Sequence, residues 1–273
     1  MLLGIDIGGT TINLGLVENN KIVRKLCVPS FRQGADLEET LVHLEDAIRQ
    51  IITPEVTKIG VGVPTLVDAE KGIVYDATNI PSWTVVPLKD RLEKTFKCTV
   101  TVNNDANCFV LGAAAMLEKP SSVIVGVTLG TGTGMGIIID GKIYNGTNCG
   151  AGELCSLPYN GGILEDFCSK KFFTANNINP KDAGDAARKG DPHALKLMDE
   201  FGIHLGKLLS IVLFAYDPGQ VVFGGGVAHN FDLFKPAMMR QLTFSYPYPR
   251  FLDKLEISAM PEGDIPVLGA SLL

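Results

Sequence analysis

The chain opens with the stretch Leu2-Leu3-Gly4-Ile5-Asp6-Ile7-Gly8-Gly9-Thr10-Thr11, an apolar strand pattern that runs into a glycine turn. The strand pattern resumes over Ile12 to Val17, so the segment predicts a β-hairpin. Two adjacent glycines let backbone N–H groups approach an anion, and Thr10 and Thr11 add hydroxyl donors. Asp6 lies where it could position a magnesium ion. Because Gly-Gly is also a common structural hairpin turn, both interpretations stay open at this point.

A second glycine-threonine turn, Gly130-Thr131-Gly132-Thr133-Gly134-Met135-Gly136, follows another strand pattern. Two such turns in matching places predict an internal structural repeat whose hairpins hold the phosphates of a nucleotide. The sequence does not match two other common nucleotide-binding motifs. The near P-loop that ends at Ile143 lacks its Ser or Thr, and no GxGxxG follows a strand in a βαβ unit.

The composition predicts a globular protein with room for a large core, since 46% of its 273 residues are hydrophobic and 20% are charged. This length suggests one large or two medium domains. A net charge of −6 without a basic block favours small molecules over nucleic acid or an anionic membrane as ligands. Six cysteines without a CxxC pair, and a start unlike a signal peptide, predict reduced thiols in the cytoplasm.

Periodicity predicts an α/β organisation. We expect helices over residues 36–52, 87–96, 104–117, 164–176, 192–216 and 265–273, a three-stranded meander over 1–28, and strands over 58–63, 99–102, 121–128, 135–143 and 220–223. We place an N-terminal α/β domain at 1–117, onto which the C-terminal helix 265–273 packs back, and a larger C-terminal α/β domain at 118–264.

The segment Asn103-Asn104-Asp105-Ala106-Asn107 lies where a predicted strand ends and a helix begins. Asn104 fits an N-cap, and the helix dipole favours the ionised form of a carboxylate in the first turn, where Asp105 lies. A substrate hydroxyl could approach it there. A weak base is enough, because phosphoryl transfer depends mainly on positioning and charge stabilisation. Asp105 is therefore the candidate catalytic base, and a purely structural helix start is the alternative.

These motifs together resemble the ROK (repressor, open reading frame, kinase) family of sugar kinases. The ordered set is Asp6-Ile7-Gly8-Gly9-Thr10, Asn103-Asn104-Asp105-Ala106, Gly130-Thr131-Gly132-Thr133-Gly134, Gly150-Ala151-Gly152-Glu153, and Asp217-Pro218 followed by Gly224-Gly225-Gly226-Val227. The resemblance implies the actin-like, ribonuclease H-like ATPase fold, with two domains and a central cleft. It also implies transfer of the ATP γ-phosphate to a hexose or N-acetylhexosamine. Repressor members carry an N-terminal helix-turn-helix, whereas the first strand here starts at residue 2, which favours a kinase.

The resemblance also assigns roles by position. Asp105 matches the catalytic base, and the expected sugar-binding residues are Asn79, Asn104, Asp105, Glu153, Ser156 and Glu165. The nucleotide is expected at Asp6, Gly8, Gly9, Thr10, Thr11, Gly130, Thr131, Gly132, Thr133, Gly224, Gly225 and Gly226, with Asp6 holding Mg²⁺ indirectly. Carboxylates and amides suit a sugar, whose hydroxyls each offer a donor and two acceptors.

One loop departs from the family pattern. Relatives usually have a histidine three residues after the Gly-Glu glutamate and then a CxCGxxGC cluster, which together bind a structural zinc. Here Ser156 takes the place of that histidine, and the cluster is replaced by a shortened loop over Leu157 to Ile163. Cys149, Cys155 and Cys168 lack paired spacing, so we expect no zinc site.

The sequence thus predicts an ATP-dependent hexokinase-type phosphotransferase that uses Mg²⁺ and acts most simply on O6 of glucose. An N-acetylmannosamine kinase or another hexose or N-acetylhexosamine kinase is the alternative within this class. A non-catalytic sugar sensor and an acetate-kinase-like enzyme are the alternatives outside it. We expect sugar and ATP as partners, neither nucleic acid nor a membrane, and a homodimer. The aromatic segment from Phe244 to Phe251 fits surface packing or an oligomer contact.

Overall fold

The computed structural model describes residues 1–77 and 79–273. Backbone contacts divide the chain into two units. Unit 1 comprises residues 1–118, 143–151 and 263–273, and unit 2 comprises residues 119–142 and 152–262. The domain boundaries expected at 1–117 and 118–264 stay a prediction.

Unit 1 is built on a five-stranded sheet in the order β3-β2-β1-β4-β8. Its strands are β1 (Leu2–Ile7), β2 (Thr11–Glu18), β3 (Lys21–Pro29), β4 (Lys58–Val63) and β8 (Thr99–Asn104). The first three form the predicted antiparallel meander, whereas β4 is parallel to both β1 and β8. A small sheet of β5 (Val67–Asp68), β6 (Ile73–Tyr75) and β7 (Val85–Pro87) lies within the same unit.

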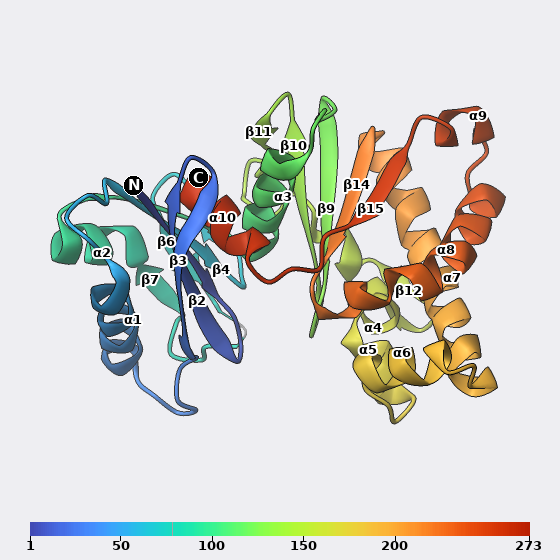
Figure 1. Ribbon diagram of the computed structural model, residues 1–273, viewed down its shortest axis with the longest axis horizontal. Helices are drawn as coiled ribbons and strands as arrows, with labels where there is room; N and C mark the ends of the chain where they lie inside the picture. Colours follow the sequence, from blue (N-terminus) through green and yellow to red (C-terminus); the bar gives the residue numbers. More distant parts are fainter. Residues whose placement is uncertain (78) are drawn as a thin grey trace. The chain divides into compact units, whose positions relative to one another are not determined.

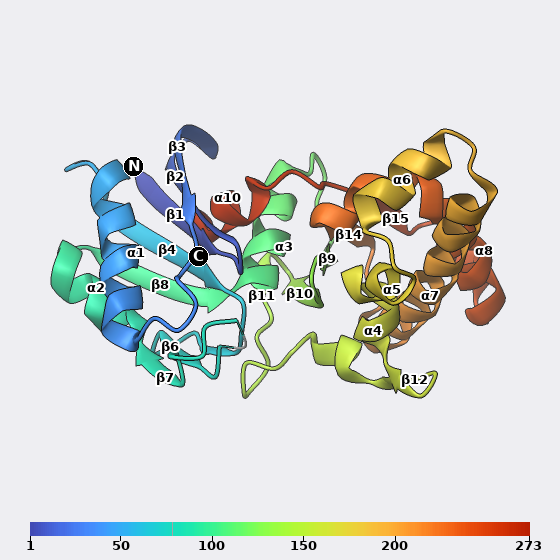
Figure 2. The same ribbon diagram turned by 90° about the horizontal axis from the view of Figure 1, so that it is seen from below.

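Helices cover both faces of this sheet. They are α1 (Leu37–Ile51), α2 (Leu88–Phe96), α3 (Asp105–Met116) and α10 (Ile265–Leu272). Figures 1 and 2 show α1 and α2 on one face and α3 and α10 on the other. Each predicted helix of this unit is confirmed to within a few residues. The start of α1 is set by Asp36, whose carboxylate accepts the N–H of Glu39 in a capping box.

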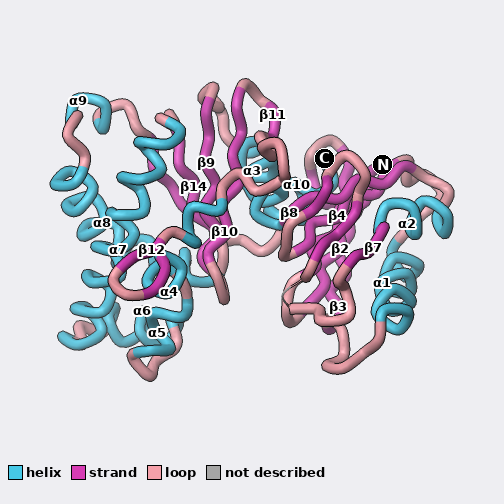
Figure 3. Tube along the Cα trace, turned by 180° about the vertical axis from the view of Figure 1, so that it is seen from behind, coloured by secondary structure: helices cyan, strands magenta, loops and turns pink. Residues whose placement is uncertain are grey.

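Unit 2 has a sheet of the order β11-β10-β9-β14-β15. Its strands are β9 (Val123–Leu129), β10 (Thr133–Ile139), β11 (Lys142–Ile143), β14 (Gln220–Gly224) and β15 (Glu256–Ala259), with a separate hairpin of β12 (Pro158–Tyr159) and β13 (Gly162–Ile163). Its helices are α4 (Leu164–Cys168), α5 (Lys170–Ala175), α6 (Pro180–Arg188), α7 (Pro192–Tyr216), α8 (Phe231–Ser245) and α9 (Pro249–Leu252), with 3-10 helices η1 (Glu153–Ser156) and η2 (Gly226–Asn230). Figure 3 shows α4 to α8 gathered on one face of the sheet.

The two large sheets share one topology, which confirms the predicted internal repeat. In each, an antiparallel meander is followed by two strands parallel to its first strand. The prediction of a single helix over 164–176 was wrong, because the segment forms two helices, α4 and α5. Ser169 separates them, and its hydroxyl accepts the N–H of Lys171 as the N-cap of α5. The short strand β15 and the helices α6 and α8 were missed.

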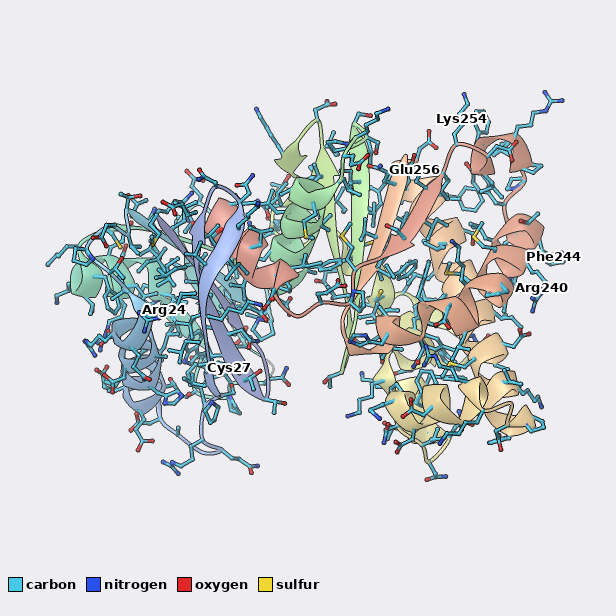
Figure 4. The ribbon with its side chains drawn as sticks, viewed as in Figure 1. Arg24, Cys27, Arg240, Phe244, Lys254 and Glu256 are labelled. Carbon is cyan, nitrogen blue, oxygen red and sulfur yellow. The ribbon has the colours of Figure 1, made fainter. Side chains whose placement is uncertain are left out.

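Two aromatic features differ in burial. Trp83 is fully buried, and its Nε1–H donates to Thr40 Oγ1 at 2.7 Å, so it is a packing residue of unit 1. Phe244 is 85% exposed and projects outward from α8 (Figure 4). Its exposure leaves the predicted oligomer contact open. Among the described residues, no helix is long and apolar enough to span a bilayer.

The C-terminal helix α10 packs backbone to backbone against the sheet and α3 of unit 1. A Cβ on Gly60 of β4 would lie 1.7 Å from the carbonyl oxygen of Ala270, and one on Gly269 would lie 1.7 Å from that of Cys108. No side chain fits at either glycine unless α10 moves. The last helix is therefore part of the core of unit 1.

This packing predicts that Gly60→Ala destabilises unit 1. The added methyl group would push α10 away from β4, and overpacking of this kind costs about 1–3 kcal/mol or more. Urea unfolding followed by circular dichroism measures the loss. Gly263→Ala is the matched control, since a Cβ there meets no atom within 4 Å, and we expect a change within about 0.5 kcal/mol. Equal stability of the two variants would contradict the packing described here.

Candidate functional site

Parallel strands bring the two candidate aspartates of unit 1 to one edge of the sheet. Asp6 lies opposite Gly62 of β4, and Gly62 lies opposite Asn103 of β8. Asp105 begins α3 directly after β8. Because the carboxyl ends of parallel strands meet at the same edge, both carboxylates lie where ligands of open α/β sheets bind.

Asp6 is a partly buried carboxylate with an unusual proton affinity. Loss of water around it raises its pKa from 3.8 to about 6, against a smaller lowering by a hydrogen bond from Asn13. Asn13 faces Asp6 across the hairpin, in the register Asp6 to Asn13. Asn13 was not among the predicted site residues, although a hairpin that turns at residues 8–11 places it opposite Asp6. Burial raises the pKa of the Cys108 thiol, and the negative charges of Asp6 and Asp105 raise it further.

These residues fit a magnesium ion. Mg²⁺ prefers carboxylate oxygens, and a cation bound at Asp6 would favour the ionised form of this desolvated carboxyl group. Among the described residues, no group of three or more His, Cys, Asp or Glu side chains could hold a metal alone. In proteins, Mg²⁺ usually keeps several waters and binds through one or two carboxylates together with substrate phosphates.

The first glycine turn uses some of its donors internally. The N–H of Gly8 donates to Thr11 O at 2.9 Å, and the Ser30 hydroxyl donates to Gly8 O at 2.8 Å. Gly9 and Thr10 are exposed at the tip. A Cβ added to Gly9 would meet no atom closer than 3.8 Å, and that nearest atom belongs to the Asn79 side chain. Packing therefore does not demand glycine at position 9, and Asn79 lies beside the turn.

Asn104 is the N-cap of α3, as predicted. Its Oδ1 accepts the N–H of Ala106 at 2.9 Å, and its Nδ2 donates to Thr65 O at 3.1 Å. Asp105 is half-buried in the first turn, where its Oδ1 also accepts the N–H of Ala106, at 2.8 Å. Asn104 thus holds both the helix start and the Thr65 loop, and it presents Asp105 at the sheet edge.

An amide network that the sequence argument missed supports this helix start. Asn107 Nδ2 donates to Asn103 Oδ1 at 2.9 Å and to Asn145 Oδ1 at 3.0 Å. Asn103 Oδ1 also accepts the N–H of Asn104 at 2.8 Å. The network joins α3 to the 143–151 segment within unit 1. Its only signal in the sequence was the density of asparagines around Asp105.

The second glycine turn, in unit 2, resembles the first in its internal bonding. The N–H of Gly130 donates to Gly132 O at 2.9 Å. Thr133 is buried, and its hydroxyl donates to Cys168 O at 2.8 Å while its N–H donates to Glu165 Oε2 at 3.0 Å. Both donors of Thr133 are therefore used within unit 2. Thr131 is exposed and lines a pocket with Lys170 and Lys171.

The third predicted nucleotide segment follows β14 at the same sheet edge. Gly225 has φ +82°, and a Cβ there would lie 2.6 Å from Leu129 O at the end of β9. Both conformation and space therefore require glycine at this position. Gly224 ends β14, and Gly226 begins η2, where a Cβ would meet nothing within 4 Å. The 224–226 segment thus lies against the end of the strand that leads into the Gly130 turn.

Glu153 and Ser156 begin and end the 3-10 helix η1. Side chains three residues apart eclipse in a 3-10 helix, so the two share one side of it. Gly152 permits the turn before them, since its φ is +97° and a Cβ would lie 2.3 Å from Met135 O. Partial desolvation, and then the nearby charge of Glu165, raise the pKa of Glu153. The carboxylates of Glu153 and Glu165 are therefore close enough for their charges to interact.

Glu165 lies in the first turn of α4 and is already paired. Its Oε1 accepts a hydrogen bond from Lys171 Nζ at 2.6 Å, and its Oε2 accepts the N–H of Thr133. A Cβ on Gly132 would lie 2.4 Å from the same Oε2. The carboxylate thus packs directly on the second glycine turn. Lys171 is a site residue that the sequence argument missed, because no periodicity places it beside Glu165.

Aromatic rings anchor the shortened loop between these two glutamates. It forms the β12–β13 hairpin with Asn160 and Gly161, both at positive φ, in its turn. The hydroxyl of Tyr159 lies 3.0 Å from His204 Nδ1 on α7, and Phe167 packs on both rings. Burial lowers the pKa of His204 and so favours the neutral form of its ring. His204 thus anchors this loop through its hydrogen bond and its ring contacts.

The cysteines near this loop have the properties of apolar packing residues. Burial raises the pKa of Cys155 to about 12 and that of Cys168 well above its usual value. Both therefore stay protonated at neutral pH, and the thiol is a much poorer metal ligand than the thiolate. Cys149 belongs to unit 1, whereas the other two belong to unit 2.

The raised pKa of Asp6 predicts a pH dependence of stability. The folded protein holds this proton more tightly than the unfolded chain, so the stabilisation is fully present below about pH 4. It is lost as the pH rises through about 6. Asp6→Asn removes this titration and should be the more stable protein at pH 7.5, by at most about 3 kcal/mol.

Thermal unfolding of both proteins between pH 4 and pH 7.5, without Mg²⁺ or nucleotide, checks this outcome. Asp253→Asn changes an exposed aspartate and serves as the control. A constant difference in melting temperature between Asp6→Asn and the wild type over this range would show that Asp6 does not titrate there.

Known proteins match this chain over nearly its whole length. The ROK family model matches residues 2–273. A glucokinase from Thermotoga maritima is 31% identical over 307 aligned residues, which cover 99% of this chain and 96% of that protein. An N-acetyl-D-glucosamine kinase from Pectobacterium carotovorum is 31% identical and is matched over 85% of both chains.

A solved structure agrees with the fold. The crystal structure of a ROK family glucokinase from Streptomyces griseus, in complex with glucose and AMPPNP, matches with a TM-score of 0.82 and 24% identity, over 99% of this chain and 97% of that one. The fold is the two-domain, actin-like α/β ATPase fold. With the family model covering residues 2–273, this chain belongs to the ROK family.

Proposed function

We propose that glucose is the acceptor of this chain and that its O6 hydroxyl receives the γ-phosphate of ATP. The chain is an ATP-dependent phosphotransferase of the hexokinase type. The observation that carries the choice of glucose is the glucokinase relative, which is 31% identical across 99% of the chain. The proposal is also supported by Asp105, a carboxylate held at the carboxyl edge of the unit 1 sheet by an N-capped helix.

In the proposed reaction, Asp105 orients the O6 hydroxyl and accepts its proton. Oxygen O6 bonds to the γ-phosphorus as the bond from that phosphorus to the β–γ bridging oxygen breaks, and ADP leaves. Most of the proton transfer follows the loosening of that bond, so a carboxylate base is sufficient. Asn104 fixes the helix start, and the position of Asp105 depends on it.

On the donor side, the proposed phosphate contacts are the exposed residues of the two turns, Gly9 and Thr10 in unit 1 and Thr131 in unit 2. The 224–226 segment would receive the adenosine. Asp6 would hold Mg²⁺ through water, and the bound ion would supply neutralising charge to the phosphates. The internal bonds of Gly8 and Gly130 keep the turns in shape.

The proposed sugar ligands are Asn79 and Asn104 in unit 1 and Glu153, Ser156 and Glu165 in unit 2. Ser156 has a shorter reach than the histidine of relatives, so preference at C1 and C2 of the sugar is the least constrained feature. An N-acetylhexosamine such as N-acetylmannosamine is the second candidate acceptor, supported by the N-acetyl-D-glucosamine kinase relative. A cytoplasmic location and a homodimer remain predictions from the sequence.

An ADP-release assay over hexoses and N-acetylhexosamines tests the acceptor. We expect the highest kcat/KM for glucose, with the product identified as the 6-phosphate by NMR. A higher value for an N-acetylhexosamine would transfer the assignment to that sugar. Calorimetric binding of sugar without any turnover would instead support the non-catalytic sensor.

In the same assay, Asp105→Asn should lower kcat by about 100-fold or more, because a general base contributes at least that factor. Asparagine keeps the size of the side chain, so calorimetry should find the sugar dissociation constant little changed. Sugar-dependent ADP release near the wild-type rate would exclude Asp105 as the base.

Gly9→Ala separates the ligand role of the first turn from a packing role. The methyl group has room within unit 1, so we expect a normal melting temperature. It would displace a phosphate from the backbone donors, and the loss of one charged hydrogen bond raises KM for ATP by about 10- to 100-fold. The sugar KM should change little. Gly263→Ala is the control, and an unchanged KM for ATP in Gly9→Ala would remove this turn from the donor site.

A further inference from the structure

One carboxylate of unit 2 touches both the proposed sugar site and the proposed phosphate site. Glu165 is a proposed sugar ligand, yet its Oε2 accepts the N–H of Thr133 in the second glycine turn. Its Oε1 is occupied by Lys171 Nζ at 2.6 Å. A sugar hydroxyl that donates to Glu165 therefore meets Lys171 at the oxygen that the turn leaves accessible.

Lys171 also lies beside the proposed phosphate site. Its side chain lines a pocket with Thr131, the exposed residue of the same turn, and with Lys170 and Thr174. The ion pair is accessible to solvent, with side chains 47% exposed for Lys171 and 27% exposed for Glu165. Pairs that exposed are weak and exchange readily. A triphosphate beside Thr131 carries more negative charge than one carboxylate, so it competes well for the ammonium group.

We propose that Lys171 couples the two substrates: a sugar hydroxyl takes its place on Glu165 Oε1, and the released ammonium group pairs with the phosphates of the nucleotide. This inference rests on the proposed function, since it takes Glu165 as a sugar ligand and the second turn as a phosphate site. Thr133 keeps its hold on Oε2 throughout, so Glu165 stays in position while Lys171 changes partner. Asp166, whose Oδ1 lies 3.6 Å from Lys171 Nζ, is the other acidic group facing the lysine within the described residues.

The coupling has a sign that a purely structural lysine would not produce. Removing Lys171 frees Oε1 for the sugar, so sugar binding in the absence of nucleotide should be as tight as before or tighter. The same change removes a cation that reaches the phosphates only after sugar binds. Nucleotide affinity should therefore lose its dependence on sugar. Because coupling is reciprocal, the ratio measured from either ligand must agree.

Calorimetry with AMPPNP, Mg²⁺ and glucose tests this on the full-length protein. For the wild type we expect saturating glucose to tighten AMPPNP binding by about 5-fold or more. In Lys171→Met that ratio should fall to about 1, with glucose alone bound at least as tightly as by the wild type. Lys171→Arg keeps the cation and should retain most of the coupling. Lys170→Met removes the other cation of the pocket. It should weaken AMPPNP binding equally with and without glucose, so its coupling ratio should stay that of the wild type, and melting temperatures verify that every variant is folded.

Three results would overturn the inference: coupling that persists in Lys171→Met, weaker glucose binding by that variant, or equal loss of coupling in Lys170→Met. The last would assign the effect to general positive charge in the pocket. Failure of the proposed function is distinct, because the wild type would then transfer phosphate to no sugar. Normal transfer with unchanged coupling in Lys171→Met would overturn this inference alone.

Discussion

The parallel pairing of β4 with β1 on one side and with β8 on the other is the constraint on which unit 1 depends. It aligns Asp6, Gly62 and Asn103 in one row and sends the chain into α3 at the same edge. An antiparallel partner in place of β4 would put Asp105 at the opposite edge from Asp6. The repeated topology of unit 2 applies the same rule to the Gly130 turn and the 224–226 segment.

Close backbone packing maintains that arrangement. The helix α10, from the far end of the chain, lies on β1 and β4 at a distance that only glycine permits. The sheet that carries Asp6 therefore depends on residues more than 250 positions away along the chain. The same reliance on glycine recurs at Gly225 and Gly152, where the left-handed backbone and a nearby carbonyl oxygen both exclude a side chain. At these positions glycine shapes the proposed site through close packing, in addition to the anion contacts proposed for the glycine turns.

Both the proposed phosphate site and the proposed sugar site contain charged side chains. Desolvation raises the pKa of Asp6, and desolvation followed by the charge of Glu165 raises that of Glu153. Lys171 compensates Glu165 with an ion pair that solvent reaches. A raised pKa means that the ionised form of a carboxyl group is destabilised. A bound cation or a hydrogen bond from a sugar hydroxyl would stabilise that form. The Tyr159–His204 pair holds the loop between the glutamates with a hydrogen bond and ring packing.

Local sequence was sufficient wherever one element specifies its own structure. It predicted both glycine turns, the N-cap at Asn104 and the repeat of the two modules, because turn residues, caps and strand periodicity act over a few positions. It could not predict the raised pKa of Asp6 or the partners of Glu165. Burial and ion pairing depend on residues that the fold brings together, and Lys171 reaches Glu165 only because a break at Ser169 divides α4 from α5. The motifs therefore indicated the chemistry, while the packed structure set how strongly each charged group is held.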